Sequence, residues 1–142
     1  MSNWVLSNNP TTTYRAKQSL ETDDGVMDWI ARNKFEIGDV VYIYEVLPPN
    51  GRGGIVYKTE VTLTGLTLDT KIDDRECWVG GDYPEYITDR TRFNRLKLIG
   101  GPANGKIPYS ELKEVGFIAP QVGAHRVDSK PSLLKFIEKR FK

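Results

Sequence analysis

The sequence predicts an α+β fold, in which a small curled antiparallel or mixed β-sheet, or an open β-barrel, is flanked by two or three short helices. A nearly continuous apolar run at residues 40–46 is typical of a central strand that is buried on both faces. Segments 54–63 and 93–99 alternate between apolar and polar residues, as half-buried strands do. An amphipathic segment after Pro131 is typical of a closing helix. The length of 142 residues fits one domain that spans residues 1–142.

Short apolar segments define the first elements. Residues 4–6 are expected to form a strand that is closed by a polar turn at residues 7–10. Apolar side chains then recur at i, i+3 and i+4 within residues 26–30. This spacing predicts a short amphipathic helix that begins near Asp23 or Asp24.

The middle of the chain predicts two strands joined as a hairpin or meander. The strand at residues 40–46 is followed by a loop rich in Pro and Gly at residues 48–54 and then by the strand at residues 54–63. Strict alternation in the second strand places four side chains on one face. These are Ile55, Tyr57, Thr59 and Val61.

The last third predicts a strand and two helices. The strand at residues 93–99 is stopped by Gly100, Gly101 and Pro102. A strand end near residue 107 leads into a short helix that Ser110 can cap and Gly116 can end. The closing helix after Pro131 carries one apolar stripe. Its members are Leu133, Leu134, Phe136, Ile137 and Phe141.

The formal net charge of +1 conceals two oppositely charged parts of the chain. Residues 1–89 carry eight basic and fifteen acidic side chains, which gives −7, and residues 90–142 carry twelve basic and four acidic side chains, which gives +8. Either the last third forms a face that attracts a polyanion, or the two parts interleave in space and their charges mix. The charge pattern alone leaves both alternatives open.

The residue pattern gives little support for catalysis, metal binding or a cofactor. His125 is the single histidine and Cys77 the single cysteine, and a nucleophilic pair would need both in contact together with an orienting group. Metal sites need several ligands at short spacings. We therefore expect a protein that is not an enzyme and has no cofactor and no metal, with Cys77 as a small buried residue.

The expected location is cytoplasmic. A single cysteine suits a reducing compartment. The first residues lack the basic-then-apolar pattern of a signal peptide, and no apolar run approaches the ~20 residues that a spanning helix needs. We expect no membrane partner.

Two tryptophans stand in polar surroundings and suggest recognition of a flat ligand. Trp29 precedes a polar stretch, and Trp78 lies in a segment that ends with two glycines, Gly80 and Gly81. A tryptophan in such a place is either a lid over the core or one wall of a pocket that stacks a ring. The pattern leaves both interpretations open for each residue.

The order of these segments resembles the EVE domain of the PUA superfamily over about residues 3–138. In that domain a tryptophan segment, here Trp29, leads to a Gly-Asp turn, here Gly38 and Asp39, then to a core strand and to a strand that opens with glycine, here Gly54. Residues 4–9 also resemble the first strand and polar turn of the related YTH domains. The resemblance implies a PUA-like fold.

Later segments extend the resemblance. Trp78 falls where these domains place a second aromatic wall, and residues 107–112 resemble their late strand–Pro–helix step. Residues 120–126 resemble the loop before the last helix, which often carries a basic residue in these families.

The resemblance implies a non-catalytic reader that takes a modified base, typically methylated, out of its strand into an aromatic cage. Such domains in bacteria and archaea are often joined to modification-dependent restriction nucleases. The implied partners are modified DNA, or RNA, and a nuclease or NTPase as a subunit or fused domain.

The same resemblance implies roles for individual residues. Trp29 and Trp78 would be the cage walls. The edge of the base would meet Ser7, Asn8 and Asn9. A flanking phosphate would be held by Arg126, His125 and Lys106.

Three alternatives to a DNA reader stay open. The first is a PUA-type module that recognises structured or modified RNA by shape and stacking. The second is a small hydrolase on a related barrel, which substitutions at His125, Asp39 and Lys58 would test. The third is an interaction domain in which Trp29 and Trp78 belong to the core.

Overall fold

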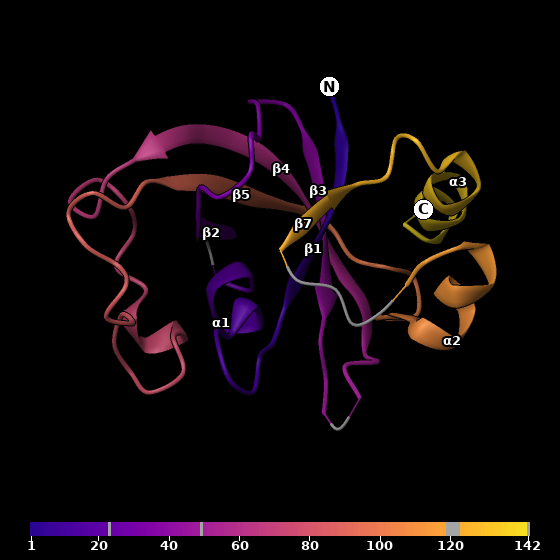
Figure 1. The fold of residues 1–142 in the computed structure, drawn as a ribbon, viewed down its shortest axis with the longest axis horizontal. Coiled ribbons are helices and arrows are strands. Elements are labelled where there is room, and N and C mark those ends of the chain that lie inside the picture. The colour runs from indigo at the N-terminus through magenta and orange to yellow at the C-terminus, as the bar shows by residue number, and fades with distance from the viewer. Residues whose placement is uncertain (23, 49, 119–122, 142) are drawn as a thin grey trace.

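Seven strands form one mixed sheet in the computed structural model, which describes residues 1–22, 24–48, 50–118 and 123–141. Along the sheet the order is β2-β5-β4-β3-β1-β7, and β6 pairs with the start of β4 (Figure 1). β1 runs parallel to β3, and the remaining pairs are antiparallel. The strands are β1 (Asn3–Asn8), β2 (Val26–Ile30), β3 (Val40–Glu45), β4 (Gly54–Leu66), β5 (Phe93–Gly100), β6 (Ile107–Pro108) and β7 (Ala124–Arg126).

The sheet is curled but open within the described part of the chain, with β2 at one edge and β7 at the other. The amide Nδ2 of Asn33, just beyond β2, donates to the carbonyl of Ala124 on β7 over 3.3 Å. Met27 of β2 and Ala124 belong to the same buried cluster. The two edges therefore approach one another around a shared interior, which confirms the predicted α+β class with a curled mixed sheet.

Three short α-helices flank the sheet in the described residues: α1 (Ala16–Leu20), α2 (Tyr109–Leu112) and α3 (Pro131–Arg140). Single turns of 3₁₀ helix, η1 (Arg75–Cys77) and η2 (Lys113–Val115), complete them. Figure 1 shows α2 and α3 together on one side of the strands and α1 on the other. No helix within the described ranges is long and apolar enough to cross a membrane.

Two hydrophobic cores follow from this arrangement. The inner core lies within the curl, and it contains Leu6 and Val41 from the sheet, Leu20 from α1 and the ring of Trp78. The outer core lies between the other face of the sheet and the helices α2 and α3. Because successive residues of a strand point to opposite faces, β1 and β3 contribute to both cores. The predicted central strand is thus confirmed as buried on both faces.

The predicted helix near residues 26–30 is wrong, because this segment is the edge strand β2 paired with β5. The helix prediction rested on the apolar spacing of Val26, Trp29 and Ile30, but the side chain of Asp28 between them is also fully buried. Both Asp28 oxygens accept hydrogen bonds from the Arg95 guanidinium at 2.8 Å, and the amide of Ile72 donates to Oδ2. This pairing offsets the desolvation of the charge and allows a strand with a buried carboxylate. Asp23, one of its two predicted starts, lies outside the described residues.

Three local predictions need smaller corrections. Ser7 and Asn8 extend β1 instead of forming a turn, because β3 supplies their strand partners. Ile55 lies in the outer core while Val61 lies in the inner one, because the β3–β4 register shifts between Ile43 and Tyr44. Helix α2 begins after Pro108 with no side-chain cap, so Ser110 does not cap it.

Other predicted elements are confirmed. The hairpin of β3 and β4 forms as expected. Gly116 ends the turn after α2 with φ of 98°, a left-handed conformation that glycine adopts without a Cβ clash. Pro131 stands at the start of α3, and Leu133 and Ile137 are buried beneath it. The buried Cys77 is also as predicted.

The carboxylate of Asp39 ties the start of β1 to the turn before β3. It accepts hydrogen bonds from the amide of Ser2 at 2.8 Å, the amide of Glu36 at 3.0 Å and the indole Nε1 of Trp4 at 3.1 Å. Burial alone would raise the pKa of this carboxyl, but the three hydrogen bonds outweigh burial and hold its pKa below the ordinary value of 3.8.

We expect Asp39→Asn to lower the free energy of unfolding by about 2 kcal/mol at neutral pH, because hydrogen bonds to a charged acceptor are lost. The pKa in the folded protein is depressed, so this stabilisation is present above the unfolded pKa of about 3.8 and is lost as the pH falls through the folded value. Urea unfolding of both proteins at neutral and acid pH measures the effect. The exposed substitution Asp69→Asn is the control, and an equal gap between wild type and Asp39→Asn at both pH values would contradict the assignment.

Candidate functional site

Two tryptophan rings from distant parts of the chain stack in the inner core. Trp29 on β2 and Trp78 after η1 have ring centroids 5.9 Å apart, and their planes differ by 6°. The ring of Tyr14 meets both edge-on, at 5.4 Å from Trp29 and 4.9 Å from Trp78. The structure therefore brings together the two residues predicted to be cage walls, whose role in binding a base stays a prediction.

The two rings differ in how firmly they are held. Trp78 is 1% exposed and forms a backbone bridge with Tyr14. The residues on either side of Trp78 are also bound to the segment around Tyr14. The amide of Arg15 donates to the carbonyl of Cys77, and the amide of Val79 donates to the carbonyl of Thr13. Trp29 is only half-buried, and it lies on an edge strand whose one strand partner in the described residues is β5. Of the two rings, Trp29 is therefore the less buried one.

The distance between the rings limits what fits between them. A centroid separation of 5.9 Å is an upper bound on the gap between their planes. Carbon atoms in contact lie about 3.5–4.0 Å apart, so a flat base held between two parallel rings needs roughly 7 Å. A base can therefore enter only if Trp29 shifts outward by about 1 Å or more, or it can stack on the outer face of Trp29.

A buried ionic network holds the Trp78 segment in place. The carboxylate of Asp74 accepts a hydrogen bond from the Tyr14 hydroxyl at 2.6 Å and forms an ion pair with Nζ of Lys71. Nζ of Lys71 also lies 3.0 Å from the hydroxyl of Tyr83. Burial, and then the neighbouring Asp74 charge, raise the pKa of Tyr14 well above 10, so the phenol stays a donor at physiological pH.

Three buried side-chain atoms lack a hydrogen-bond partner within the described residues: Ser7 Oγ, Asn8 Oδ1 and Trp78 Nε1. All three belong to residues predicted to bind a base. The amide Nδ2 of Asn8 donates to the carbonyl of Tyr14 at 2.7 Å, which orients Oδ1 as the remaining acceptor. Such atoms cost about 1–3 kcal/mol each unless a ligand or water pairs with them.

The polar residues of the first strand do not share one surface. Asn8 has the parity of Trp4 and Leu6 and faces the inner core, where Tyr14 contacts it. Ser7 has the parity of Val5, which lies in the outer core. The side chain of Asn9 accepts from the amides of Thr11 and Thr12 and so shapes the following turn. The structure therefore places Asn8, and not Ser7, on the inner-core face in contact with Tyr14, the neighbour of both tryptophans.

The predicted phosphate-binding residues also fall into separate places. Arg126 is exposed and its guanidinium stacks on the ring of Trp4, 5.0 Å from the centroid. His125 is exposed next to it on β7 and has the parity of Val5. Lys106 precedes β6, at the start of β4, whereas Trp29 pairs with β5 near the end of β4. Of the three, the two β7 residues lie nearer the approach of the sheet edges, and residues 120–122 of their predicted loop lie outside the described ranges.

The structure adds residues that the sequence did not single out. Tyr14 is the shared neighbour of Asn8, Trp29 and Trp78, yet it stands in a polar Thr-rich stretch that carries no ring-stacking signal. Arg32, just beyond β2, is exposed and places its guanidinium 5.4 Å from the ring centre of Tyr86. Both positions depend on contacts between segments more than 50 residues apart.

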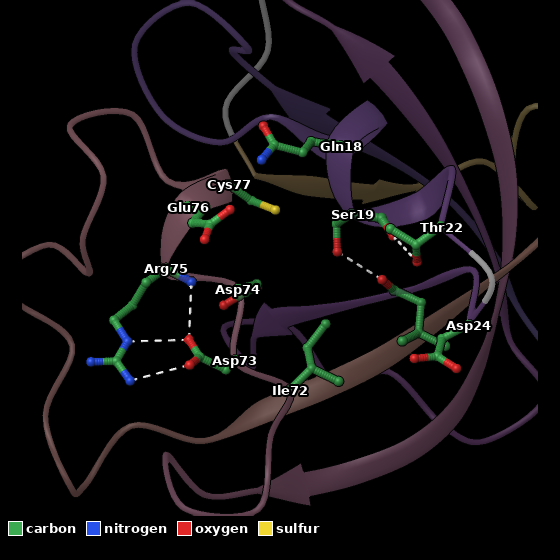
Figure 2. A pocket seen from close by; sticks show the side chains of 11 residues that line it. Gln18, Ser19, Thr22, Asp24, Ile72, Asp73, Asp74, Arg75, Glu76 and Cys77 are labelled. Carbon is green, nitrogen blue, oxygen red and sulfur yellow. Dashed lines mark hydrogen bonds and ion pairs between the residues drawn. The ribbon is translucent and has the colours of Figure 1, made fainter.

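A pocket of about 520 Å³ lies next to the Asp74 network and is lined in part by Asp74 itself (Figure 2). Figure 2 shows Asp73, Asp74 and Glu76 on one wall and Ser19 of α1 on another. Its one basic lining residue, Arg75, is paired with Asp73 at 3.1 Å. The excess of negative charge makes this pocket unsuited to a phosphate backbone.

We expect Tyr14→Phe to lower the free energy of unfolding by about 2 kcal/mol, because the hydroxyl donates to a buried charged acceptor. The Trp78 segment should also loosen, so a soluble quencher should reduce tryptophan fluorescence more strongly than in the wild type. Urea unfolding and quenching titrations measure both effects. Tyr86→Phe at an exposed position is the control, and unchanged stability with unchanged quenching would contradict the role given to Tyr14.

The chain is similar to known proteins in sequence over part of its length and in fold over nearly all of it. No family model matches the chain. It is 26% identical over 124 residues to a tryptophan–tRNA ligase from Corynebacterium efficiens. That match covers 82% of this chain and 36% of the ligase, so the chain spans about a third of the length of that relative.

Solved structures match nearly the whole chain. Human THYN1, crystallised in complex with DNA containing 5-methylcytosine, superposes with a TM-score of 0.64 at 11% identity, over 98% of this chain and 96% of that one. A mutant of ZmASCH from Zymomonas mobilis gives 0.63 at 13% identity over 100% of both chains. A hypothetical protein from Leishmania major gives 0.63 at 16% identity, over 98% and 93%. The chain has the EVE/PUA-like fold that its sequence predicted.

Proposed function

We propose that the protein binds nucleic acid and recognises a modified base that is turned out of its strand and stacked against Trp29 and Trp78. The observation that carries the proposal is the parallel pair of indole rings, with the unpaired acceptor Asn8 Oδ1 bound to their shared neighbour Tyr14 through its amide. A base that leaves its stack loses a few kcal/mol, which aromatic faces and polar atoms at its edge must return. The proposed role of this chain is recognition without catalysis.

The unpaired acceptor Asn8 Oδ1 is the polar atom that can read the base edge, by accepting an N–H from the base. The Nε1–H of Trp78 points along the plane of its own ring, so it does not meet a base that is stacked on the ring face. Pairing Asn8 Oδ1 recovers the free energy that its burial costs in the unliganded protein.

Entry of the base depends on Trp29. The ring spacing of 5.9 Å is too small for a sandwiched base, and Trp78 is locked by its backbone contacts. The base enters as Trp29 moves outward with the edge strand β2. The free energy spent on this opening lowers the affinity for every base and leaves binding dependent on the contacts of the correct one.

We propose more specifically that the base is methylated and belongs to DNA. The protein would then be the recognition part of a modification-dependent restriction system in the cytoplasm. Human THYN1, which shares the fold over nearly its whole length, was crystallised with DNA containing 5-methylcytosine, which supports 5-methylcytosine as the first ligand to test. A nuclease or NTPase, as a subunit or as a fused domain, would then supply the cleavage.

RNA is the second candidate ligand. The partial match to a tryptophan–tRNA ligase favours it, because that enzyme is named for a tRNA substrate. Stacking on Trp29 serves a single-stranded RNA base as well as a DNA base, since each base has a π-face. Competition between DNA and RNA oligonucleotides of one sequence separates the two.

We expect DNA with one 5-methylcytosine to bind at least about tenfold more tightly than the unmodified strand in fluorescence anisotropy titrations, and Trp29→Ala to remove most of that difference. Loss of a stacking partner costs about 1–3 kcal/mol per base, or five- to 150-fold in Kd. Lys135→Ala on α3, remote from the rings, is the matched control and should bind as the wild type does.

The proposal fails if no modified base on either DNA or RNA is preferred and Trp29→Ala binds as tightly as the wild type. A preference for modified RNA over modified DNA would select the second candidate.

A further inference from the structure

We infer that the pocket beside Trp78 holds the nucleotide next to the turned-out base, stacked on the ring of Tyr86, an inference that rests on the proposed function. The pocket has a volume of about 570 Å³, within the usual range for small-ligand sites. It lies between the turn after β1, which supplies Thr12 and Thr13, and the loop after Trp78, which supplies Gly80, Tyr83 and Tyr86.

The pocket borders both walls of the base site. On one side Val79, directly after Trp78, belongs to its lining, and the Tyr83 ring meets Trp78 edge-on at 6.5 Å. On the other side Arg32, three residues after Trp29, contacts Tyr86. The amide of Val79 donates to Thr13 at 2.9 Å and joins the two loops that form the pocket. A nucleotide that follows a base held at Trp29 thus meets this pocket first.

The side chains suit a base more than a phosphate. Tyr86 is 55% exposed, so part of its ring is available for stacking, and Arg32 covers it from one side. Asp82 and Glu85 also line the pocket and repel an anion. The base therefore enters the pocket, while its phosphate lies toward Arg32, whose guanidinium matches phosphate geometry.

The pocket has little means to select a particular base. Tyr86 presents a ring face, which accepts any base. The hydroxyls of Thr12 and Thr13 can each donate or accept a hydrogen bond. This subsite thus adds affinity for a strand over a free nucleoside, with weak preference among the four bases.

The test compares two ligands with and without the Tyr86 ring. Isothermal titration measures 5-methyldeoxycytidine alone and a trinucleotide with 5-methylcytosine between two thymidines, on the wild type, Tyr86→Ala and Tyr86→Phe. We expect Tyr86→Ala to weaken trinucleotide binding about tenfold and to leave nucleoside binding unchanged. Tyr86→Phe keeps the ring and should bind both ligands as the wild type does.

A fluorescent base in the flanking position gives a second readout. 2-Aminopurine that replaces one thymidine should be quenched on binding to the wild type and less so on binding to Tyr86→Ala. Equal trinucleotide affinity in the wild type and Tyr86→Ala overturns the subsite and leaves the proposed function intact. Failure of the wild type to bind either ligand overturns 5-methylcytosine on DNA as the ligand of the proposed function, and the subsite with it.

Discussion

The candidate site depends on the hydrogen bond and the ion pair that the buried carboxylate of Asp74 forms. Asp74 pairs with Lys71, which lies near the start of the long connection between β4 and β5. It also accepts a hydrogen bond from Tyr14, which lies just before α1. Tyr14 in turn contacts Asn8 through its carbonyl and both tryptophans through its ring. One charged group therefore positions a polar acceptor and a fixed aromatic wall that come from segments about 70 residues apart.

Charge burial explains how the segment that carries Trp78 is held in place. A carboxylate removed from water is tolerated when a cation and further donors surround it, and partial loss of such a network is costly. Lys71 and Tyr14 meet that requirement for Asp74, and Arg95 with the amide of Ile72 meets it for Asp28. Both networks anchor the connection between β4 and β5, which carries Trp78. Trp29 directly follows Asp28, so its strand shares the second network, but the ring of Trp29 itself is only half-buried at the edge of the sheet.

Local sequence pattern accounts for those parts of the fold that depend on a single segment. The apolar strand β3, the hairpin with β4 and the stripe of α3 are of this kind. β2 was mistaken for a helix because its apolar residues recur at helical spacing, and only the distant partner Arg95 makes Asp28 a core residue. The same limit applies to the site: the resemblance brought Trp29 and Trp78 together, but Tyr14 and the separation of Ser7 from Asn8 depend on packing and on the extent of β1.

The charge split along the chain takes on a specific meaning in three dimensions. Four of the fifteen acidic side chains of residues 1–89 line the pocket next to Asp74, where they discourage a phosphate backbone: Asp24, Asp73, Asp74 and Glu76. Basic residues lie where the sheet edges approach: Arg32 follows β2, Arg126 lies on β7, and the Asn33–Ala124 hydrogen bond joins their segments. Under the proposed function, these few cations would give a small, salt-sensitive attraction for any strand. Selectivity would then come from the ring pair, because a weak general attraction spends little binding energy on unmodified nucleic acid.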